Sequence, residues 1–315
     1  MNGKKIVFGP VPSRRLGQSL GINNIPPKVC SYSCVYCQIG KTLKMEIERE
    51  EFYKVEEIVK EVEETVEILT KRGEKIDYLS FVPDGEPTLD KNLGQEIREL
   101  KKTGIKIAVI TNSSLLWKED VREDLKEADW VSVKIDAVSE NLWRKINRPF
   151  RKLNLSEILK GIENFSSEFQ GFLASETMLV EGINDTEVEI EKIASFIKNI
   201  KIEKSYISIP TRPPSEKWVF PPSPEKLNMA YQIFRNSKIE VEFLTGYGGV
   251  DFGFTGNLEN DILRITSVHP MRADQVEELV KKANGKWKDI EKLVEEEKLV
   301  KINYRNQTYY LRKFR

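Results

Sequence analysis

The sequence predicts an α/β protein in which a mainly parallel sheet is followed by a small second domain. Short apolar segments that suit strands alternate with longer segments whose apolar residues recur near every 3.6 positions, as in helices that cover a sheet. The strand-like segments return roughly every 25 to 40 residues, which leaves room for a right-handed crossover helix between parallel strands. Near Thr255 this alternation ends, so we expect one domain over residues 1–250 and another over 255–315.

Six short apolar segments are expected to form the parallel strands of the first domain. They are residues 20–23, 77–82, 106–111, 130–136, 172–180 and 206–210. The segments with helical periodicity are residues 52–72, 93–103, 116–127, 156–166, 187–198 and 224–234, and one more extended segment covers residues 239–244. Six such units wind in one sense into a barrel or an open arc.

The second domain is expected to combine helices with a hairpin. The predicted elements are a strand at residues 262–266, helices at 272–282 and 287–296, and strands at 298–303 and 307–313. Two helices followed by a hairpin indicate a winged-helix-like module. Its candidate recognition helix carries Glu291, Glu295 and Glu296, and an acidic helix does not suit a phosphate-rich groove. We therefore expect no sequence-specific binding of DNA.

Composition gives little direct indication of a partner. The chain has 315 residues with 50 basic and 50 acidic side chains, so its overall charge does not favour nucleic acid or an acidic partner. No segment approaches the ~20 apolar residues that a membrane span requires, and the first residues lack the apolar core of a secretory signal. A cytoplasmic protein without a membrane partner is the expectation.

Three cysteines carry the most specific signal in the chain. Cys30, Cys34 and Cys37 are its only cysteines, and their spacing is Cys-x3-Cys-x2-Cys. Clustered thiolates are typical metal ligands, and an iron–sulfur cubane commonly takes four of them. Three ligands would leave one iron open to a further molecule. A zinc site normally needs four Cys or His ligands, and the single histidine, His269, is distant in the sequence, although zinc and incidental free thiols stay as alternatives.

With the aromatic Tyr36 just before Cys37, this motif resembles the signature of the radical S-adenosylmethionine (radical SAM) superfamily. The resemblance implies an incomplete (β/α)6 barrel, a [4Fe–4S] cluster on the three cysteines, and SAM bound at the open iron beside Tyr36. It also implies an electron donor such as flavodoxin or ferredoxin. In the superfamily, reductive cleavage of SAM gives a 5′-deoxyadenosyl radical that abstracts hydrogen from the substrate.

A second motif, Asp84-Gly85-Glu86-Pro87-Thr88, follows the second predicted strand. It resembles the Gly-Gly-Glu element of the superfamily, which contacts the SAM amino group. Gly85 and Glu86 match that element, whereas Asp84 stands where the first glycine usually lies. A cationic ammonium needs acceptors, and glycine allows close approach of the backbone. A simple turn after the strand is the alternative interpretation.

Two further strands end in polar residues that we assign to the SAM site. Asn112 and Ser113 resemble the Thr-Asn-Gly element of relatives, although they also suit a helix cap. Lys134 and Asp136 alternate with apolar residues and are expected on the inner face of the barrel, where charged groups are buried only when paired. A purely structural ion pair is the alternative.

Other loops give weaker signals. Arg14 and Arg15 lie in a glycine-bracketed loop before the first predicted strand, where two guanidinium groups suit a carboxylate or phosphate. Arg212, after the sixth strand, and the glycine-rich residues 246–249 are candidate substrate loops, whereas His269 is expected to be structural. On the fifth strand, Glu176 is expected either to line the cavity or to pack in the core.

Residues 5–250 resemble in particular the radical SAM proteins grouped with wyosine-synthesis enzymes, such as tRNA 4-demethylwyosine synthase. Those enzymes carry a second cluster on three further cysteines, which this chain lacks. The resemblance implies a radical SAM enzyme that acts on an unidentified substrate, with RNA or tRNA as the leading candidate. Modification of a protein or peptide, including glycyl-radical activation, is one alternative. A non-enzymatic redox sensor is the other.

Overall fold

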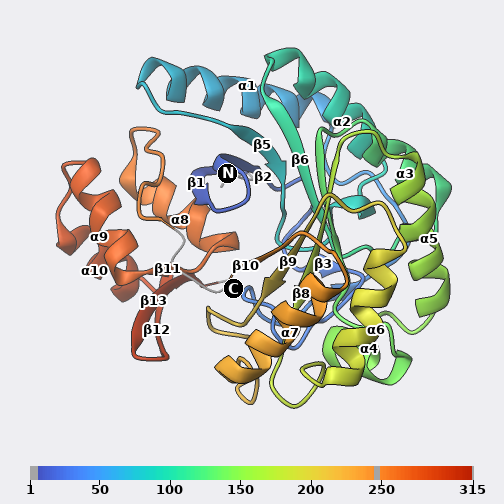
Figure 1. The fold of residues 1–315 in the computed structure, drawn as a ribbon. Coiled ribbons are helices and arrows are strands. Elements are labelled where there is room, and N and C mark those ends of the chain that lie inside the picture. Colours follow the sequence, from blue (N-terminus) through green and yellow to red (C-terminus); the bar gives the residue numbers. More distant parts are fainter. Residues whose placement is uncertain (1–5, 245–248, 314–315) are drawn as a thin grey trace.

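The computed structural model describes residues 6–244 and 249–313. One eight-stranded sheet curls into a half barrel, and helices cover its outer face (Figure 1). The order of the strands is β1-β2-β5-β6-β7-β8-β9-β10. β1 is antiparallel to β2, and each following pair is parallel. This partial barrel confirms the predicted α/β fold class.

The sheet contains all six strands predicted from the sequence and one further strand at each edge. Its strands are β1 (Val7–Ser13), β2 (Gly17–Ile22), β5 (Tyr78–Phe81), β6 (Lys106–Thr111), β7 (Trp130–Lys134), β8 (Phe172–Met178), β9 (Lys204–Ser208) and β10 (Val241–Leu244). A separate short pair, β3 (Val29–Cys30) and β4 (Lys44–Met45), forms in the loop after β2. β1 lies in the glycine-bracketed segment that was expected to be a loop, and only its turn with β2 holds the two arginines.

Six of the seven barrel helices in the described part of the chain lie in segments with the predicted helical periodicity, whereas the helix at Glu140–Asn147 was not predicted. The seven helices are α1 (Val55–Lys71), α2 (Leu93–Leu100), α3 (Glu119–Lys126), α4 (Glu140–Asn147), α5 (Leu155–Glu168), α6 (Glu187–Lys198) and α7 (Pro224–Asn236), with short 3-10 turns at Pro87–Leu89 and Lys101–Thr103. In α1 the residues that face the sheet, such as Ile58, Val62 and Leu69, are fully buried, while Glu and Lys occupy the outer face. Burial of this apolar stripe, rather than helix propensity, explains why the segment is helical.

The C-terminal residues form three helices and a small sheet. The elements are α8 (Leu258–Val268), β11 (Met271–Arg272), α9 (Ala273–Lys282), α10 (Trp287–Glu295), β12 (Leu299–Tyr304) and β13 (Gln307–Arg312), with the strand order β11-β13-β12. The predicted strand at residues 262–266 is wrong, because this segment lies inside α8. Ile262 and Ile265 are buried one helical turn apart, and Asn257 caps the helix by accepting from the backbone N–H of Asn260.

The C-terminal elements pack against the edge of the barrel. Phe8 and Val11 of β1 belong to the same apolar cluster as Ile262, Val276 and other residues of the C-terminal helices. Figure 1 shows these helices beside β1 and β2, on the open side of the half barrel. The division into domains at 1–250 and 255–315 stays a prediction, since this cluster crosses the boundary.

Two expectations from the sequence concern the glycine-rich segment near the end of the barrel and the lack of a membrane span. Residues 246–248 of the glycine-rich segment lie outside the described residues. In the described part of the chain, no helix is both long and apolar enough to cross a membrane.

Candidate functional site

The three cysteines lie in the loop after β2, at the carboxyl ends of the parallel strands. This loop is anchored by the pairing of β3 with β4 and by its contact with the segment after β5. An added Cβ at Gly85 would lie 1.9 Å from the carbonyl oxygen of Val29, the residue just before Cys30. Gly85 is therefore required for the close approach of these two backbones. In addition, the N–H of Glu86 donates to that carbonyl oxygen at 3.2 Å.

Two asparagine side chains donate hydrogen bonds to the sulfur atoms of the cysteine loop. Nδ2 of Asn112 lies 3.5 Å from Sγ of Cys30, and Nδ2 of Asn147 lies 3.4 Å from Sγ of Cys34. Burial is the main cause that raises the pKa of all three thiols, to about 12 for Cys34 and about 11 for Cys37. The charge of Glu86 also raises the pKa of Cys30, and that of Asp136 raises the pKa of Cys34. Such thiols keep their protons unless a metal replaces them, since metal coordination deprotonates a thiol outright.

Within residues 6–244 and 249–313, no three His, Cys, Asp or Glu side chains are grouped as ligands of one metal ion. A cubane cluster makes a different demand on its ligands, because each of its thiolates binds a different iron. Asparagine donors to the sulfur atoms also suit a cluster, since hydrogen bonds to the sulfurs tune its potential.

Glu86 is fully engaged with the protein. Its Oε1 accepts from the hydroxyls of Thr88 and Thr111, both at 2.6 Å, and its Oε2 accepts from the backbone N–H of Asn112 at 2.7 Å. Burial raises the pKa of this carboxyl, and the hydrogen bonds oppose that rise. Glu86 thus joins the end of β5 to the end of β6 and holds Asn112 beside Cys30.

Asp84, which stands where the motif usually has its first glycine, is one of the buried acceptors without a hydrogen-bond partner in the described part of the chain. Neither carboxylate oxygen has a hydrogen-bond partner among the described residues, although the side chain is fully buried. Burial raises its pKa to about 8, although Lys28 lowers it, and its charge in turn raises the pKa of Cys37. A buried carboxylate is costly unless it is paired. Its unsatisfied oxygens beside the cysteine loop fit a cationic ligand such as an ammonium group.

Asn112 and Ser113 play different parts. The Asn112 amide donates to Ser31 at 2.9 Å as well as to Cys30, so it faces the cysteine loop. Ser113 is fully buried with φ of +69°, and its hydroxyl accepts from the N–H of Lys134 at 2.7 Å. Ser113 therefore ties β6 to the end of β7, and its side chain points toward backbone.

The predicted inner-face residues of β7 belong to one ionic network. Lys134 donates to Glu176 of β8 at 2.7 Å, and the second oxygen of Glu176 accepts from Arg15. Burial would raise the pKa of Glu176, but Lys134 and Arg15 hold it well below its usual range. Asp136 accepts from the Tyr36 hydroxyl, and Nζ of Lys134 lies 5.2 Å from the centre of the Tyr36 ring. Burial opposes the charge of Lys134, but the carboxylates outweigh this effect and raise its pKa.

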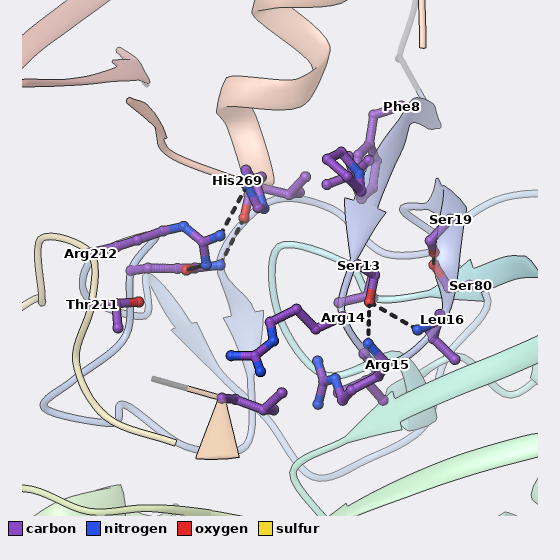
Figure 2. A pocket seen from close by; sticks show the side chains of 17 residues that line it. Phe8, Ser13, Arg14, Arg15, Leu16, Ser19, Ser80, Thr211, Arg212 and His269 are labelled. Atoms are coloured by element: carbon purple, nitrogen blue, oxygen red, sulfur yellow. Dashed lines mark hydrogen bonds between the residues drawn. The ribbon is translucent and has the colours of Figure 1, made fainter. Parts of the chain in front are cut away.

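Beside this network lies a cavity of about 220 Å³ between the sheet and the end of α8 (Figure 2). Arg14 and Arg15 enter it from the β1–β2 turn, Arg212 from the segment after β9, and His269 from the end of α8. Gln38, the residue after Cys37, also lines it, so the cavity adjoins the cysteine loop.

Comparison with known proteins identifies the family. The model of the Radical SAM superfamily matches residues 24–197. A UPF0026 protein, MJ1312 of Methanocaldococcus jannaschii, is 50% identical over 309 residues, which are 98% of this chain and 96% of that protein. A radical SAM methyltransferase from Sphaerobacter thermophilus has a TM-score of 0.53 at 16% identity, covering 73% of this chain and 67% of that one. TYW1 with a lysine-pyruvate adduct bound has a TM-score of 0.50 at 15% identity, covering 69% and 73%.

The chain therefore belongs to the radical SAM superfamily, and it is an enzyme that uses a [4Fe–4S] cluster and SAM. This finding excludes the non-enzymatic redox sensor. Sequence reasoning left out Asp84 and Asn147 and left Glu176 undecided between cavity and core. The signal for Asp84 was present, since a carboxylate that replaces a glycine in a cofactor motif needs a partner.

Proposed function

We propose that Cys30, Cys34 and Cys37 hold the [4Fe–4S] cluster and that the surrounding polar residues bind SAM. The proposed SAM site comprises Tyr36, Gly85, Glu86, Asn112, Ser113, Lys134 and Asp136, as expected from the sequence, together with Asp84. The observation that supports this proposal most strongly is the buried carboxylate of Asp84, which has no hydrogen-bond partner among the described residues and whose charge acts on Cys37.

The residues of the proposed site fall into two groups: those that can contact SAM directly and those that hold other residues in place. Asp84 has two free acceptors for the ammonium of SAM, whereas the contacts of Glu86 and Ser113 make them positioning residues. Lys134 carries a buried positive charge beside Tyr36, and a buried ammonium group suits a carboxylate ligand. Gly85 acts through the backbone, because its lack of a side chain lets the motif pack against the cysteine loop.

When bound, the cluster and SAM supply a 5′-deoxyadenosyl radical that abstracts a hydrogen atom from the substrate. The residues of this chain would hold SAM by placing charged groups opposite its ammonium and carboxylate groups. The sheet and α8 would enclose the site. An external one-electron donor such as flavodoxin or ferredoxin would deliver the electron.

We infer RNA as the leading substrate class, in line with the wyosine-like subgroup that the sequence resembles. The fold similarity to TYW1 is compatible with this proposal. The chain has no further cysteines for a second cluster, so its reaction differs from that of the wyosine enzymes in at least that respect. Modification of a protein or peptide is the alternative outcome of the experiment below.

Anaerobic reconstitution tests the cofactor proposal. The protein is loaded with iron and sulfide, reduced with dithionite in the presence of SAM, and assayed for 5′-deoxyadenosine. We expect about four irons per chain and formation of 5′-deoxyadenosine, both lost in Cys34→Ala but kept in Ser33→Ala, which changes a residue of the same loop. Wild-type product formation by Cys34→Ala would refute the ligand assignment.

The substrate class is tested by comparing a deletion strain with its parent. Mass analysis of digested tRNA and of the proteome should show one modified nucleoside missing in the deletion strain. A missing protein modification with unchanged tRNA would instead support the peptide alternative.

A further inference from the structure

The cavity beside the cysteine loop has an unusual charge balance for a partly enclosed site. None of the 17 residues that line it is acidic, whereas three are arginines: Arg14, Arg15 and Arg212. Hydroxyl and amide groups of Ser13, Ser19, Ser80, Thr211 and Gln38 add further polar atoms to the lining. Such a lining favours an anion.

Arg212 is the arginine of this cavity without an acidic partner among the described residues. Its guanidinium contacts two neutral side chains, Oε1 of Gln38 at 3.0 Å and Nε2 of His269 at 3.0 Å. The segments outside the described residues contain no Asp or Glu. Burial, opposed by Tyr309 and assisted by the nearby charges of Arg272 and Arg15, lowers the pKa of Arg212 to about 10. Burial and those arginines also keep the pKa of His269 well below its usual value, so His269 is a neutral partner.

The groups around the cavity leave an excess of positive charge. Glu242 is shared by Arg14 at 3.6 Å and Lys204 at 2.7 Å, and Glu176 is shared by Lys134 and Arg15. Of the three arginines that line the cavity, Arg14 and Arg15 each share a carboxylate with a lysine, and Arg212 has no acidic partner among the described residues. Arg272 does not add to this excess, because Asp274 accepts from its Nε at 2.9 Å.

The volume and the apolar lining residues of the cavity limit which ligands can bind there. A volume of about 220 Å³ is below the roughly 300–1,000 Å³ of sites for drug-sized molecules. The site therefore takes a small molecule or one group of a larger one. The lining also includes the apolar side chains of Leu16, Val82, Ile110, Leu244 and Val268.

We propose that this cavity binds a phosphate group of the substrate, with Arg212 as its principal ligand and Arg14 as a second. A phosphate monoester carries close to two negative charges at neutral pH and a phosphodiester of RNA carries one, so either brings the negative charge that a lining with three arginines and no acidic residue favours. One planar guanidinium group can donate two parallel hydrogen bonds to two oxygens of a phosphate. The contacts with His269 and Gln38 hold the Arg212 guanidinium in place. This inference rests on the proposed function, since it names the chemistry that a substrate would bring to the cavity beside the cluster.

Binding is measured on the reconstituted holoenzyme loaded with SAM but not reduced, so that no turnover occurs. Calorimetric titration with adenosine 5′-monophosphate and guanosine 5′-monophosphate is compared with the corresponding nucleosides and with acetate, all at one ionic strength. We expect the monophosphates to bind and the nucleosides and acetate to bind at least tenfold more weakly. Equal binding of nucleoside and nucleotide would overturn the proposal.

Variants then assign the phosphate contact. Arg212→Gln should weaken nucleotide binding by about 10- to 100-fold, because hydrogen bonds to charged groups are among the strongest. Arg14→Gln should weaken it several-fold and leaves Glu242 paired with Lys204, so it tests the site even when Arg212→Gln does not fold. Arg235→Gln on α7, which removes an exposed arginine paired with Glu240, is the matched control and should bind as the wild type does. Unchanged binding in both cavity variants would refute the assignment.

A further binding experiment distinguishes between a free nucleotide and a nucleotide within RNA as the source of the phosphate group. A free nucleotide as substrate predicts that monophosphates bind more tightly than short single-stranded RNA. A nucleotide within RNA predicts the reverse order, with RNA binding that also weakens in Arg212→Gln. If 5′-deoxyadenosine forms with SAM but neither probe binds, the phosphate site alone is wrong. If no cluster assembles, the proposed function itself fails.

Discussion

Replacing Glu176 by glutamine tests whether the ionic network inside the barrel stabilises the fold. The substitution keeps the shape of the side chain but removes the only carboxylate that accepts from both Lys134 and Arg15 among the described contacts. The side chains of Lys134 and Glu176 are only 15% and 11% exposed. Breaking a buried pair by removing one partner typically costs about 3–5 kcal/mol, because the remaining charge stays buried without compensation.

The expected shift in melting temperature follows from the size of the chain. An unfolding entropy of about 2.1 cal/mol/K per residue gives about 0.66 kcal/mol/K for 315 residues. A loss of about 3–5 kcal/mol therefore lowers the melting temperature by about 5–8 °C. Urea unfolding and calorimetry of the cluster-free protein measure this directly, without a contribution from cluster binding. Glu242→Gln on β10, two strands away in the same sheet, is the control, because its partly exposed ion pairs are worth about 1 kcal/mol or less.

The pH dependence of the same variant gives a second check with a defined sign. The folded protein holds the pKa of Glu176 well below its value in the unfolded chain, which is about 4.3. Its stabilising effect is therefore complete above about pH 5 and is lost progressively as the pH falls below about 4. The stability difference between wild type and Glu176→Gln should narrow over that range. A loss below about 1 kcal/mol, or a difference that stays constant from pH 6 to pH 3, would refute the reasoning.

Two further predictions concern the cysteine loop. Gly85→Ala places a Cβ 1.9 Å from the Val29 carbonyl oxygen, so iron loading should fall strongly. In contrast, Gly73→Ala, with φ of +73° and open space around it, should cost about 1–2 kcal/mol and load normally; equal loading of the two would contradict the packing argument. In the cluster-free protein, Asp136→Asn should lower the pKa of Cys34, because the charge of Asp136 raises it. Iodoacetamide alkylation followed against pH would show a lower midpoint, and an unchanged or higher midpoint would count against the assigned proximity.

The sequence predicted most of the fold because its two periodicities are clear. The six parallel strands and most of the helices that cover them follow from apolar patterning alone. The segment 262–266 failed because Ile262, Leu263 and Ile265 satisfy both a short strand and one turn of a buried helix. Only its contact with β1 and the capping by Asn257 decide between them.

The site was predictable where a motif is local in sequence and was not where it depends on tertiary contacts. The cysteine spacing and the Gly85-Glu86 element lie within short segments, so their chemistry could be inferred directly. The contact of Arg212 with His269 joins residues 57 positions apart, and that of Arg15 with Glu176 joins residues 161 positions apart. No spacing rule connects such pairs, so the sequence could not predict these contacts.

The central claim is that three thiolates leave one iron of a cubane available to SAM, and electron paramagnetic resonance tests it most directly. The reconstituted protein is reduced anaerobically, and its spectrum is recorded with and without SAM. We predict one signal from a reduced [4Fe–4S] cluster whose g values change when SAM is added. A cluster signal that SAM leaves unchanged, or a protein that binds no cluster, would contradict the account.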